Sequence, residues 1–318
     1  MVVADRKKIT VCVPCFNEEG NIDNAYARIT KVMQGLPEYD YEIIFADNNS
    51  TDRSRELIRD ICERDRAHAK AIFNEQNMGP GRSGNNLVFS SSGDAVAIIP
   101  CDLQEPPELI PQFIEWWEKG YKLVMGQKQD SELSKVNKGS RGLYYKIIDI
   151  FSDYPEYPQV TGFGLMDISV VRTFQRMGEP VTEWRHLFAE CGYDVKLIPY
   201  KQAARTAGKS SYNLWRFLDH GILSLCTTSR KPLRWMTLLG LAAAVLAFIV
   251  GIVYLVLKII NWNNMDMGTA PILIGVFFIG AVQLFCIGML GEYIGIVSER
   301  VKSKERPLVI EREHINFD

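Results

Sequence analysis

The chain has 318 residues and a formal net charge of −2, which is enough sequence for one large or two modest domains. This nearly neutral balance lacks the basic footprint of a nucleic-acid-binding protein, so we expect no nucleic-acid partner. Its seven cysteines are an odd number scattered through apolar segments, which suits a reducing cytoplasm better than a disulfide framework.

Strand-like and helix-like segments alternate along residues 9–127. The strand-like apolar runs are 9–15, 41–46, 69–74, 94–100 and 122–127. Helical patterns follow the first four runs, and Asn17 is a candidate N-cap for the first of these helices. Strands that alternate with helices predict a Rossmann-like α/β fold with a mostly parallel, doubly wound sheet.

Two local motifs in this region resemble known binding motifs but do not predict the corresponding sites. Cys12 and Cys15 form a CxxC pair, but positions three apart on a strand face opposite ways. We therefore expect buried packing for both thiols in preference to a metal or redox pair. The glycine-rich segment 77–86 matches neither GxGxxG nor GxxxxGKS/T, so it indicates neither a dehydrogenase nor a P-loop ATPase.

Polar side chains gather where the predicted strands end. Asn17 and Glu18 follow the first strand, Asp47 follows the second, and Asp102 and Gln104 follow the fourth. Ligands of parallel sheets bind beyond the carboxyl ends of the strands, so these residues together predict one binding site. The alternative, in which Asp47 or Asp102 merely caps the helix that follows it, stays open.

Two long apolar segments lie in the C-terminal third of the chain. Residues 236–257 and 271–291 contain no charged side chain, and each is close to the roughly 20 residues that cross a bilayer. Two buried helices of a soluble protein are the alternative, but such helices rarely lack a polar face. We therefore expect a two-helix transmembrane hairpin over 235–293, with a C-terminal tail over 294–318.

The flanking charges predict how this hairpin is oriented. Basic residues precede the first span and follow the second, whereas the connecting segment has Lys258 as its one basic residue. These flanking residues are Arg230, Lys231, Arg234, Arg300, Lys302, Lys304 and Arg306. Positive charge marks the cytoplasmic side, and residues 1–10 lack the apolar core of a signal peptide. Both termini and the domain over 1–210 are thus predicted to be cytoplasmic, on a multi-pass protein of the inner membrane.

The segment between these two parts, 211–234, has apolar side chains at helical spacing. They are Tyr212, Trp215, Leu218, Ile222 and Leu225. This pattern predicts a juxtamembrane amphipathic helix that lies in the membrane interface. A helix packed against the preceding domain is the alternative.

Five motifs carry a resemblance to a known family. They are VPCFNEE (13–19), ADNNSTD (46–52), CDLQEPPELI (101–110), TGFGLMD (161–167) and RTAGKSSY (205–212). The chain resembles the family 2 glycosyltransferases of GT-A fold. Within this family it looks like the polyprenyl-phosphate glycosyltransferases, such as dolichol-phosphate mannose synthase and the GtrB-type bactoprenol glucosyltransferases. The likeness covers nearly the whole chain and also suggests a homo-oligomer.

The resemblance implies roles for individual residues. Asp102 and Gln104 would hold Mg²⁺ or Mn²⁺ against the diphosphate of a nucleotide sugar. The nucleotide pocket would be lined by Pro14, Phe16, Glu18 and Asp47. The phosphate of the acceptor would be met by Lys128, Arg141, Arg205 and Lys209. Of all these residues, Asp102, Arg205 and Lys209 would be catalytic.

The chain departs from the family's pattern in three places. Pro100 stands where the metal motif commonly begins with an acid, and Phe16 replaces the usual Tyr. TGFGLMD has glycines where many relatives carry an Asp and an Arg. The missing acid should weaken metal binding in the absence of nucleotide, so we expect the ion and the sugar nucleotide to bind as a unit.

The chemistry of the acceptor decides whether the enzyme needs a base. A sugar hydroxyl usually needs one, whereas a lipid phosphate, with a second pKa of about 6, is already ionised near neutral pH. The chain contains neither a Glu-Asp dipeptide nor the QxxRW signature of processive synthases. These absences favour a phosphate acceptor.

The sequence therefore predicts a membrane-bound, metal-dependent hexosyltransferase. It would move one sugar, with inversion, from a UDP- or GDP-sugar to polyprenyl (undecaprenyl) phosphate on the cytoplasmic leaflet, for cell-surface glycan assembly or modification. Two alternatives remain open. One is a glycosyltransferase with a hydroxyl lipid acceptor, and the other is a catalytically impaired, membrane-anchored scaffold that binds nucleotide sugars.

Overall fold

The computed structural model describes residues 6–129, 157, 159–177, 188, 192–202, 231–260, 269–304 and 311–317. The chain divides into two compact units. The sheet unit comprises Met1–Tyr145, Tyr154–Ser211 and Arg300–Asp318, and the helical unit comprises Lys146–Asp153 and Tyr212–Glu299. Each unit is described by itself.

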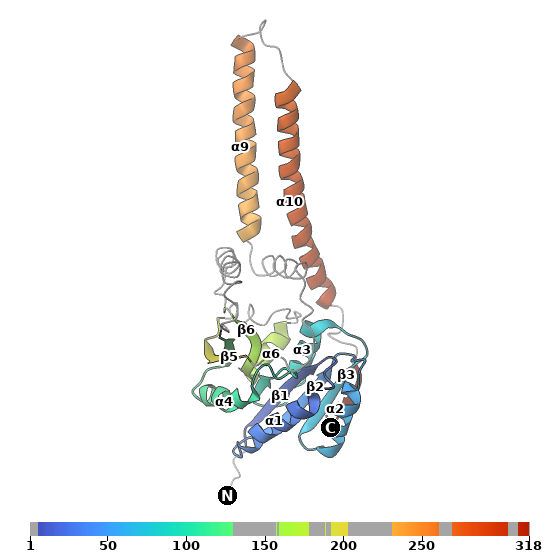
Figure 1. Cartoon of the computed structure of the whole chain (residues 1–318). Coiled ribbons are helices and arrows are strands. Elements are labelled where there is room, and N and C mark those ends of the chain that lie inside the picture. Colours follow the sequence, from blue (N-terminus) through green and yellow to red (C-terminus); the bar gives the residue numbers. More distant parts are fainter. Residues whose placement is uncertain are drawn as a thin grey trace. The chain divides into compact units, whose positions relative to one another are not determined.

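One mixed sheet forms the centre of the sheet unit (Figure 1). Its eight strands follow the order β7-β5-β6-β4-β1-β2-β3-β8. They are β1 (Lys8–Cys15), β2 (Asp40–Asp47), β3 (Ala69–Asn74), β4 (Ala95–Ile98), β5 (Leu123–Lys128), β6 (Val160–Asp167), β7 (Val195–Tyr200) and β8 (Glu311–Ile315). The pairs β1–β2, β1–β4, β2–β3 and β5–β7 are parallel, whereas β6 and β8 run antiparallel to their neighbours. The predicted mostly parallel sheet is confirmed.

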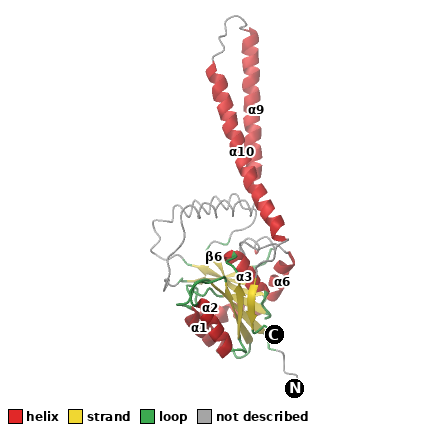
Figure 2. Ribbon diagram, turned by 90° about the vertical axis from the view of Figure 1, so that its right-hand side faces the viewer, coloured by secondary structure: helices red, strands yellow, loops and turns green. Residues whose placement is uncertain are grey.

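Helices cover both faces of this sheet (Figure 2). They are α1 (Ile22–Gln34), α2 (Ser54–Arg64), α3 (Gly79–Phe89), the 3₁₀ turn η1 (Pro107–Leu109), α4 (Ile110–Glu118) and α6 (Ile168–Met177). The buried side chains of α1, α2 and α4 share one core cluster, whereas those of α3 and α6 belong to a second. Because successive residues of a strand face opposite sides, each of the strands β1 to β7 has side chains in or against both clusters, as a doubly wound sheet requires. Ile315 of β8 packs against the first cluster.

The CxxC pair is divided between these two clusters. Cys12 belongs to the cluster under α3 and α6, and Cys15 to the one under α1, α2 and α4. Both thiols are free and buried. Burial raises the pKa of the Cys12 thiol to about 12, so this thiol stays neutral at physiological pH. The expectation of buried packing is confirmed for this pair.

The first helix begins later than its sequence pattern indicates. α1 starts at Ile22 and its N-cap residue is Asn21, so the assignment of Asn17 as N-cap was wrong. Asn17 has a left-handed backbone with a φ of 56°. Its side-chain oxygen accepts a hydrogen bond from the Thr51 backbone N–H at 2.9 Å. Contact with the neighbouring loop, which local periodicity does not encode, outweighs the capping preference.

The last strand of the sheet comes from the end of the chain. β8 pairs antiparallel with β3, so residues that follow both long apolar segments complete the edge of the sheet. The sequence patterns did not indicate this strand, nor β6 and β7. All three lie beyond residue 127, where the simple alternation of strand and helix ends.

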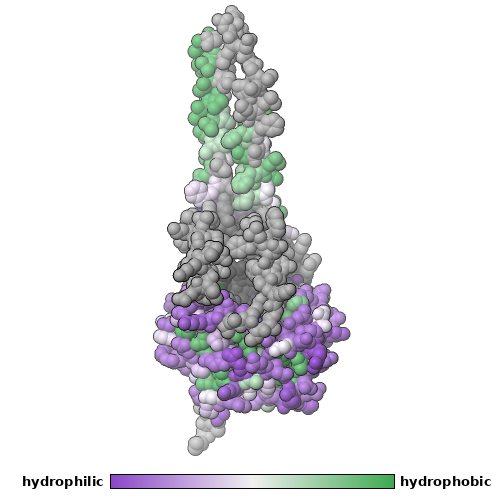
Figure 3. Space-filling model, viewed as in Figure 1, coloured by the Kyte–Doolittle hydropathy of each residue, from purple (hydrophilic) through white to green (hydrophobic). Residues whose placement is uncertain are grey.

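The described part of the helical unit consists of α9 (Lys231–Ile260) and of α10 (Thr269–Lys304) as far as Glu299. The stretches Leu233–Val253 and Phe278–Gly295 are long and apolar enough to cross a membrane, by length and composition. Apolar side chains dominate the described surface of these helices that is visible in Figure 3, whereas the visible surface of the sheet unit is largely hydrophilic. The predicted amphipathic helix lies outside the described residues, except that 231–234 open α9.

Candidate active site

The carboxyl ends of six strands meet at one edge of the sheet. β1, β2, β3 and β4 are parallel, and β5 runs with them because both β4 and β5 are antiparallel to β6. β7 is parallel to β5. This edge therefore gathers Phe16 and Glu18 after β1, Asp47 at the end of β2, and Lys128 at the end of β5. Asp102 and Gln104 follow β4 there, so this edge carries every described residue of the predicted site.

Three residues at this edge have unusual backbone conformations. Asn17, Asn49 and Leu103 have φ values of 56°, 66° and 53°, in the left-handed region that residues other than glycine seldom adopt. They follow β1, β2 and β4 respectively. Strained backbone of this kind concentrates at functional sites. Its repetition along one edge supports placing the site there.

The loops that follow β1 and β2 are laced together by hydrogen bonds. The backbone N–H of Asn17 donates to Ser50 Oγ at 2.9 Å, and that of Glu18 donates to Ser54 Oγ at 2.9 Å. The Glu18 carboxylate in turn accepts from Asn21 Nδ2 at 2.6 Å. Glu18, one of the predicted nucleotide-binding residues, is thereby held on a platform that joins the two loops.

Pro14 and Phe16 lie beside this platform. Pro14 is half-buried near the end of β1. Phe16 follows the strand and is 45% exposed. A flat ring held at the end of a strand can stack on a nucleobase.

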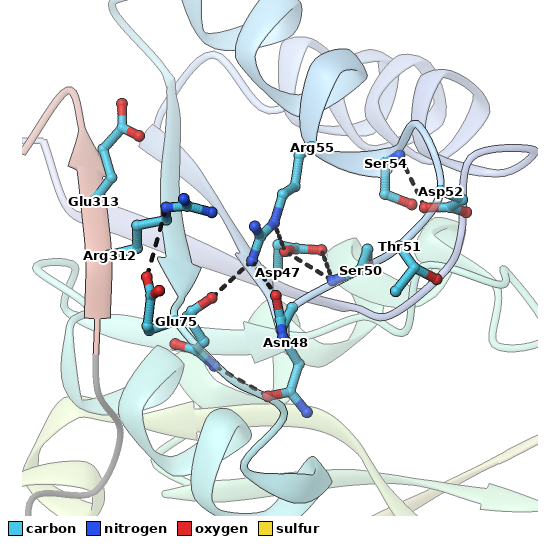
Figure 4. Close-up of polar contacts among 12 residues, drawn as sticks. Asp47, Asn48, Ser50, Thr51, Asp52, Ser54, Arg55, Glu75, Arg312 and Glu313 are labelled. Carbon is cyan, nitrogen blue, oxygen red and sulfur yellow. Dashed lines mark hydrogen bonds and ion pairs between the residues drawn. The ribbon is translucent and has the colours of Figure 1, made fainter.

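Asp47 is fully buried at the end of β2 and does not cap a helix. Its carboxylate accepts from Arg55 Nε at 2.6 Å and from the Ser50 backbone N–H at 3.1 Å (Figure 4). The N-cap residue of α2 is Arg53, without a side-chain capping bond, so the helix-cap alternative for Asp47 was wrong. Arg55 also donates to Asn49 Oδ1 at 2.9 Å and to the Asn74 carbonyl at 2.7 Å. The ion pair therefore ties the ends of β2 and β3 to α2.

The loop that follows β4 shows a regular alternation of burial. Cys101, Leu103 and Glu105 are buried, whereas Asp102 and Gln104 between them are partly exposed. The Gln104 backbone N–H donates to Asp102 Oδ1 at 3.2 Å. The loop thus presents one carboxylate and one amide outward on adjacent, linked residues.

Asp102 does not cap the helical turn that follows its loop. The N-cap residue of η1 is Pro106, without a side-chain capping bond. The helix-cap alternative for Asp102 was therefore wrong as well. Its carboxylate closes a turn within the loop instead.

Glu105 is a site residue that the sequence reasoning missed. It is 5% exposed, and its Oε1 accepts from Tyr200 Oη at 3.2 Å and from Thr161 Oγ1 at 3.4 Å. Burial and the neighbouring charge of Asp102 raise the pKa of the Glu105 carboxyl, although the two hydroxyl donors partly oppose this. The only sequence signal was an acid placed directly after Gln104, and nothing local indicated its partners.

The oxygen atoms that this loop offers to a metal suit one kind of ion. No group of three His, Cys, Asp or Glu side chains able to hold a metal occurs within the described ranges. Asp102 and Gln104 offer a carboxylate and an amide oxygen, both hard donors of the type that Mg²⁺ and Mn²⁺ prefer. Such a pair fits an ion whose other ligands are substrate phosphates and water, and it does not fit a closed protein cage.

The predicted cationic residues are only partly described. Lys128 is the last residue of β5, and its backbone N–H donates to the Gln159 carbonyl at 3.0 Å. Arg141, Arg205 and Lys209 lie outside the described residues. The grouping of these four around an acceptor phosphate stays a prediction.

Comparison with known proteins gives two family matches. Residues 10–174 match the model of glycosyl transferase family 2, and residues 231–297 match the GtrB C-terminal hairpin. The first match contains the laced loops and the Asp102 loop. The second spans most of the two apolar helices.

Similar proteins agree with this division. A prophage bactoprenol glucosyl transferase homolog of Escherichia coli is 30% identical over 95% of this chain and 98% of that protein. The bactoprenol glucosyl transferase of Shigella phage SfII is 30% identical over 96% and 98% of the two chains. Among solved structures, the mannosyltransferase PcManGT of Pyrobaculum calidifontis, in complex with GDP-Man and Mn²⁺, has a TM-score of 0.50. It is 15% identical and covers 94% of this chain and 88% of that one, which shows a shared GT-A fold.

Three findings lead to one conclusion. One edge of the sheet gathers the described residues of the predicted site, a family model matches half of the chain, and the relatives are of nearly equal length. The chain belongs to glycosyl transferase family 2, and within it to the GtrB type, with a catalytic GT-A domain and a GtrB C-terminal hairpin.

Proposed function

We propose that this enzyme transfers a single sugar, with inversion, from a UDP- or GDP-sugar to polyprenyl phosphate, in bacteria undecaprenyl phosphate. The observation that carries the proposal is the outward pair Asp102 and Gln104, at the sheet edge of a family 2 chain that also contains a GtrB hairpin. The relatives named bactoprenol glucosyl transferases support the lipid phosphate acceptor.

The residues around the first two strands would bind the nucleotide. The exposed Phe16 ring would stack on the base, and Glu18, fixed by Asn21 and Ser54, would accept hydrogen bonds from the ribose. Pro14 would line the pocket beside them. Asp47 is buried, so we assign it the task of holding the loop through Arg55.

Asp102 and Gln104 would hold a divalent ion together with the donor diphosphate. When bound, such an ion offsets the negative charge that collects on the leaving diphosphate. Mn²⁺ in the complex of PcManGT supports this assignment. Because the protein supplies one carboxylate, the ion and the nucleotide sugar should bind together.

The acceptor would be held by cations and would need no base. A lipid phosphate is already ionised, since its second pKa lies at about 6. Arg205, Lys209, Lys128 and Arg141 would position it opposite the leaving group, which gives inversion. With domain 1–210, interfacial helix 211–234, hairpin 235–293 and tail 294–318, both termini would lie on the cytoplasmic side of the inner membrane.

The experiment measures nucleotide release by the purified full chain against a panel of UDP- and GDP-sugars. Each donor is tested with and without undecaprenyl phosphate, in Mn²⁺, in Mg²⁺ and in EDTA. Release that needs both lipid and metal is the expected result. Release that needs lipid but survives EDTA would keep the transferase and remove the metal site.

Two further outcomes address the alternatives. A product that resists mild acid would point to a hydroxyl acceptor, because a sugar phosphodiester is labile. Nucleotide-sugar binding without lipid-dependent release from any donor would leave the scaffold as the better account.

A further inference from the structure

The end of β7 contacts the Asp102 loop at two points. Tyr200, the last residue of β7, donates its hydroxyl to Glu105 Oε1 at 3.2 Å. Two residues later, Gln202 Nε2 donates to Gln104 Oε1 at 3.2 Å. These residues lie 95 and 98 positions apart in the chain. Neither contact belongs to the hydrogen-bond ladder of the sheet.

The Tyr200 ring has its place set by packing. It meets the Phe163 ring edge-on at 5.2 Å between centroids. Gly126 makes room for both rings, since a Cβ there would lie 2.4 Å from Phe163 and 3.1 Å from Tyr200. The ring therefore does not depend on Glu105 for its position. Its hydroxyl, together with that of Thr161, holds the buried Glu105 carboxyl in place.

The second contact controls the direction of an amide. The terminal torsion of a glutamine has broad, roughly two-fold preferences, so its oxygen and nitrogen exchange places easily. A donor on Oε1 keeps the oxygen on the side of Gln202, and a carbonyl oxygen has a second lone pair for another partner. In this arrangement an oxygen of Gln104, and not its NH₂, is available to a cation.

We propose that Tyr200 and Gln202 are positioning residues, which act through Glu105 and Gln104 to hold the Asp102 loop ready for the cation and the donor diphosphate. This inference rests on the proposed function, in which Asp102 and Gln104 hold the ion. Partners behind metal ligands orient them, and removing such partners typically lowers metal affinity about 10–100-fold. Here the orienting contacts come from the end of β7, the strand at one edge of the sheet, and from Gln202 after it.

Two variants test the two contacts separately. Tyr200→Phe removes one hydroxyl and keeps the ring against Phe163, and Gln202→Met keeps the length of the side chain without its donor. Tyr193→Phe is the matched control, because Tyr193 donates to Thr173 Oγ1 at 3.4 Å and packs in the core cluster under α3 and α6. All three are made in the full chain.

Mn²⁺ binding is measured by electron paramagnetic resonance in the presence of UDP, and turnover is titrated with Mn²⁺. We expect both positioning variants to bind Mn²⁺ about 10-fold more weakly or worse, with turnover largely restored at saturating Mn²⁺. Tyr193→Phe should match the wild type. The melting temperature in EDTA should be similar in all four proteins, which separates positioning from a general loss of structure.

Three results would overturn the proposal or separate it from the function on which it rests. Unchanged Mn²⁺ affinity in both variants refutes the positioning role. A wild type that binds no Mn²⁺ with UDP removes the metal site and this inference with it. A wild type that binds Mn²⁺ with UDP but transfers no sugar refutes the proposed function, while the resonance measurement still decides the positioning role.

Discussion

Asp102 is partly exposed between the buried residues Cys101 and Leu103, and its substitution tests the metal assignment directly. Asp102→Asn keeps the shape and the acceptor for the Gln104 N–H, and removes the charge. We expect kcat/KM to fall about 100–1,000-fold, because an electrostatic contact to the leaving group is lost. Steady-state kinetics at saturating Mn²⁺ check this. The control Asp60→Asn, at an exposed position of α2, should leave kcat/KM unchanged. A tenfold loss in this control would mean that the effect of Asp102→Asn is not specific to the site.

Glu42 shows how a buried carboxylate can stabilise the unit away from the site. Its side chain is 1% exposed on β2 and accepts from Lys8 Nζ at 2.8 Å and Thr10 Oγ1 at 2.6 Å. Lys70 Nζ lies at 2.9 Å, and the Ser92 backbone N–H donates at 2.9 Å. Burial alone would raise the pKa of Glu42, but these donors outweigh it and lower the pKa to about 2.

This depressed pKa makes stability depend on pH in a defined direction. As the pH falls, Glu42 takes up a proton in the unfolded chain before it does so in the folded chain. The contribution of the Glu42 carboxylate to stability is therefore complete above about pH 4.5 and is lost as the pH falls toward about 2. It is on the order of 3 kcal/mol. Thermal melts of the wild type and Glu42→Gln from pH 7 to pH 3 should converge as the pH falls. Curves that stay parallel would show that Glu42 is not the titrating group.

At the scale of elements, α2 holds the ends of β2 and β3 through one arginine. Arg55 is the cationic partner of Asp47, whose carboxylate is fully buried, and it also bonds the carbonyl at the end of β3. Arg55→Met should destabilise the protein by about 3–5 kcal/mol, because it leaves a buried charge uncompensated. Denaturant unfolding measures this loss.

A control on the same helix separates this effect from surface charge. Arg53→Met removes an exposed pair with Glu56 at 3.6 Å and should change stability by less than about 1 kcal/mol. The double variant Asp47→Asn with Arg55→Met should recover part of the loss. Equal losses in the single and double variants would mean that the pair itself is not the cause.

For the molecule as a whole, the chain returns to the sheet unit after its apolar helices. β8 covers the edge of β3, and Glu313 forms a two-point ion pair with Arg59 of α2. Asn316 Nδ2 donates to the carbonyls of Cys62 at 2.9 Å and Ala69 at 2.8 Å. The segment after the hairpin is therefore part of the catalytic domain's structure.

Deleting residues 311–318 should uncover the edge of β3. Unpaired strand edges promote association, so we expect a lower melting temperature and self-association in size-exclusion chromatography. Glu313→Gln, which keeps the strand, should lower the melting temperature by only about 2–4 °C, since its partly exposed ion pair contributes at most about 1 kcal/mol. A truncated chain that melts and elutes like the wild type would show that β8 adds nothing.

The sequence by itself determined the features that local pattern encodes. Apolar runs marked β1 to β5, composition marked the two long apolar helices, and the acids and amides after the strands marked the edge that carries Asp102 and Gln104. In a parallel sheet, strand direction alone brings such residues together. The spacing of Cys12 and Cys15 was likewise sufficient to predict that their side chains lie on opposite faces of the sheet, because a strand has a period of two.

Only the tertiary structure decided what depends on residues far apart in the chain. Glu105 meets Tyr200 across 95 positions, and Arg59 meets Glu313 across 254. No local periodicity specifies such a pair, because each partner is an ordinary polar residue until the sheet order places β7 and β8. The same holds for Asp47, which chain order suggests as a helix cap and which packing makes the buried partner of Arg55. Local pattern thus located the site, and long-range packing determined which side chains hold it in place.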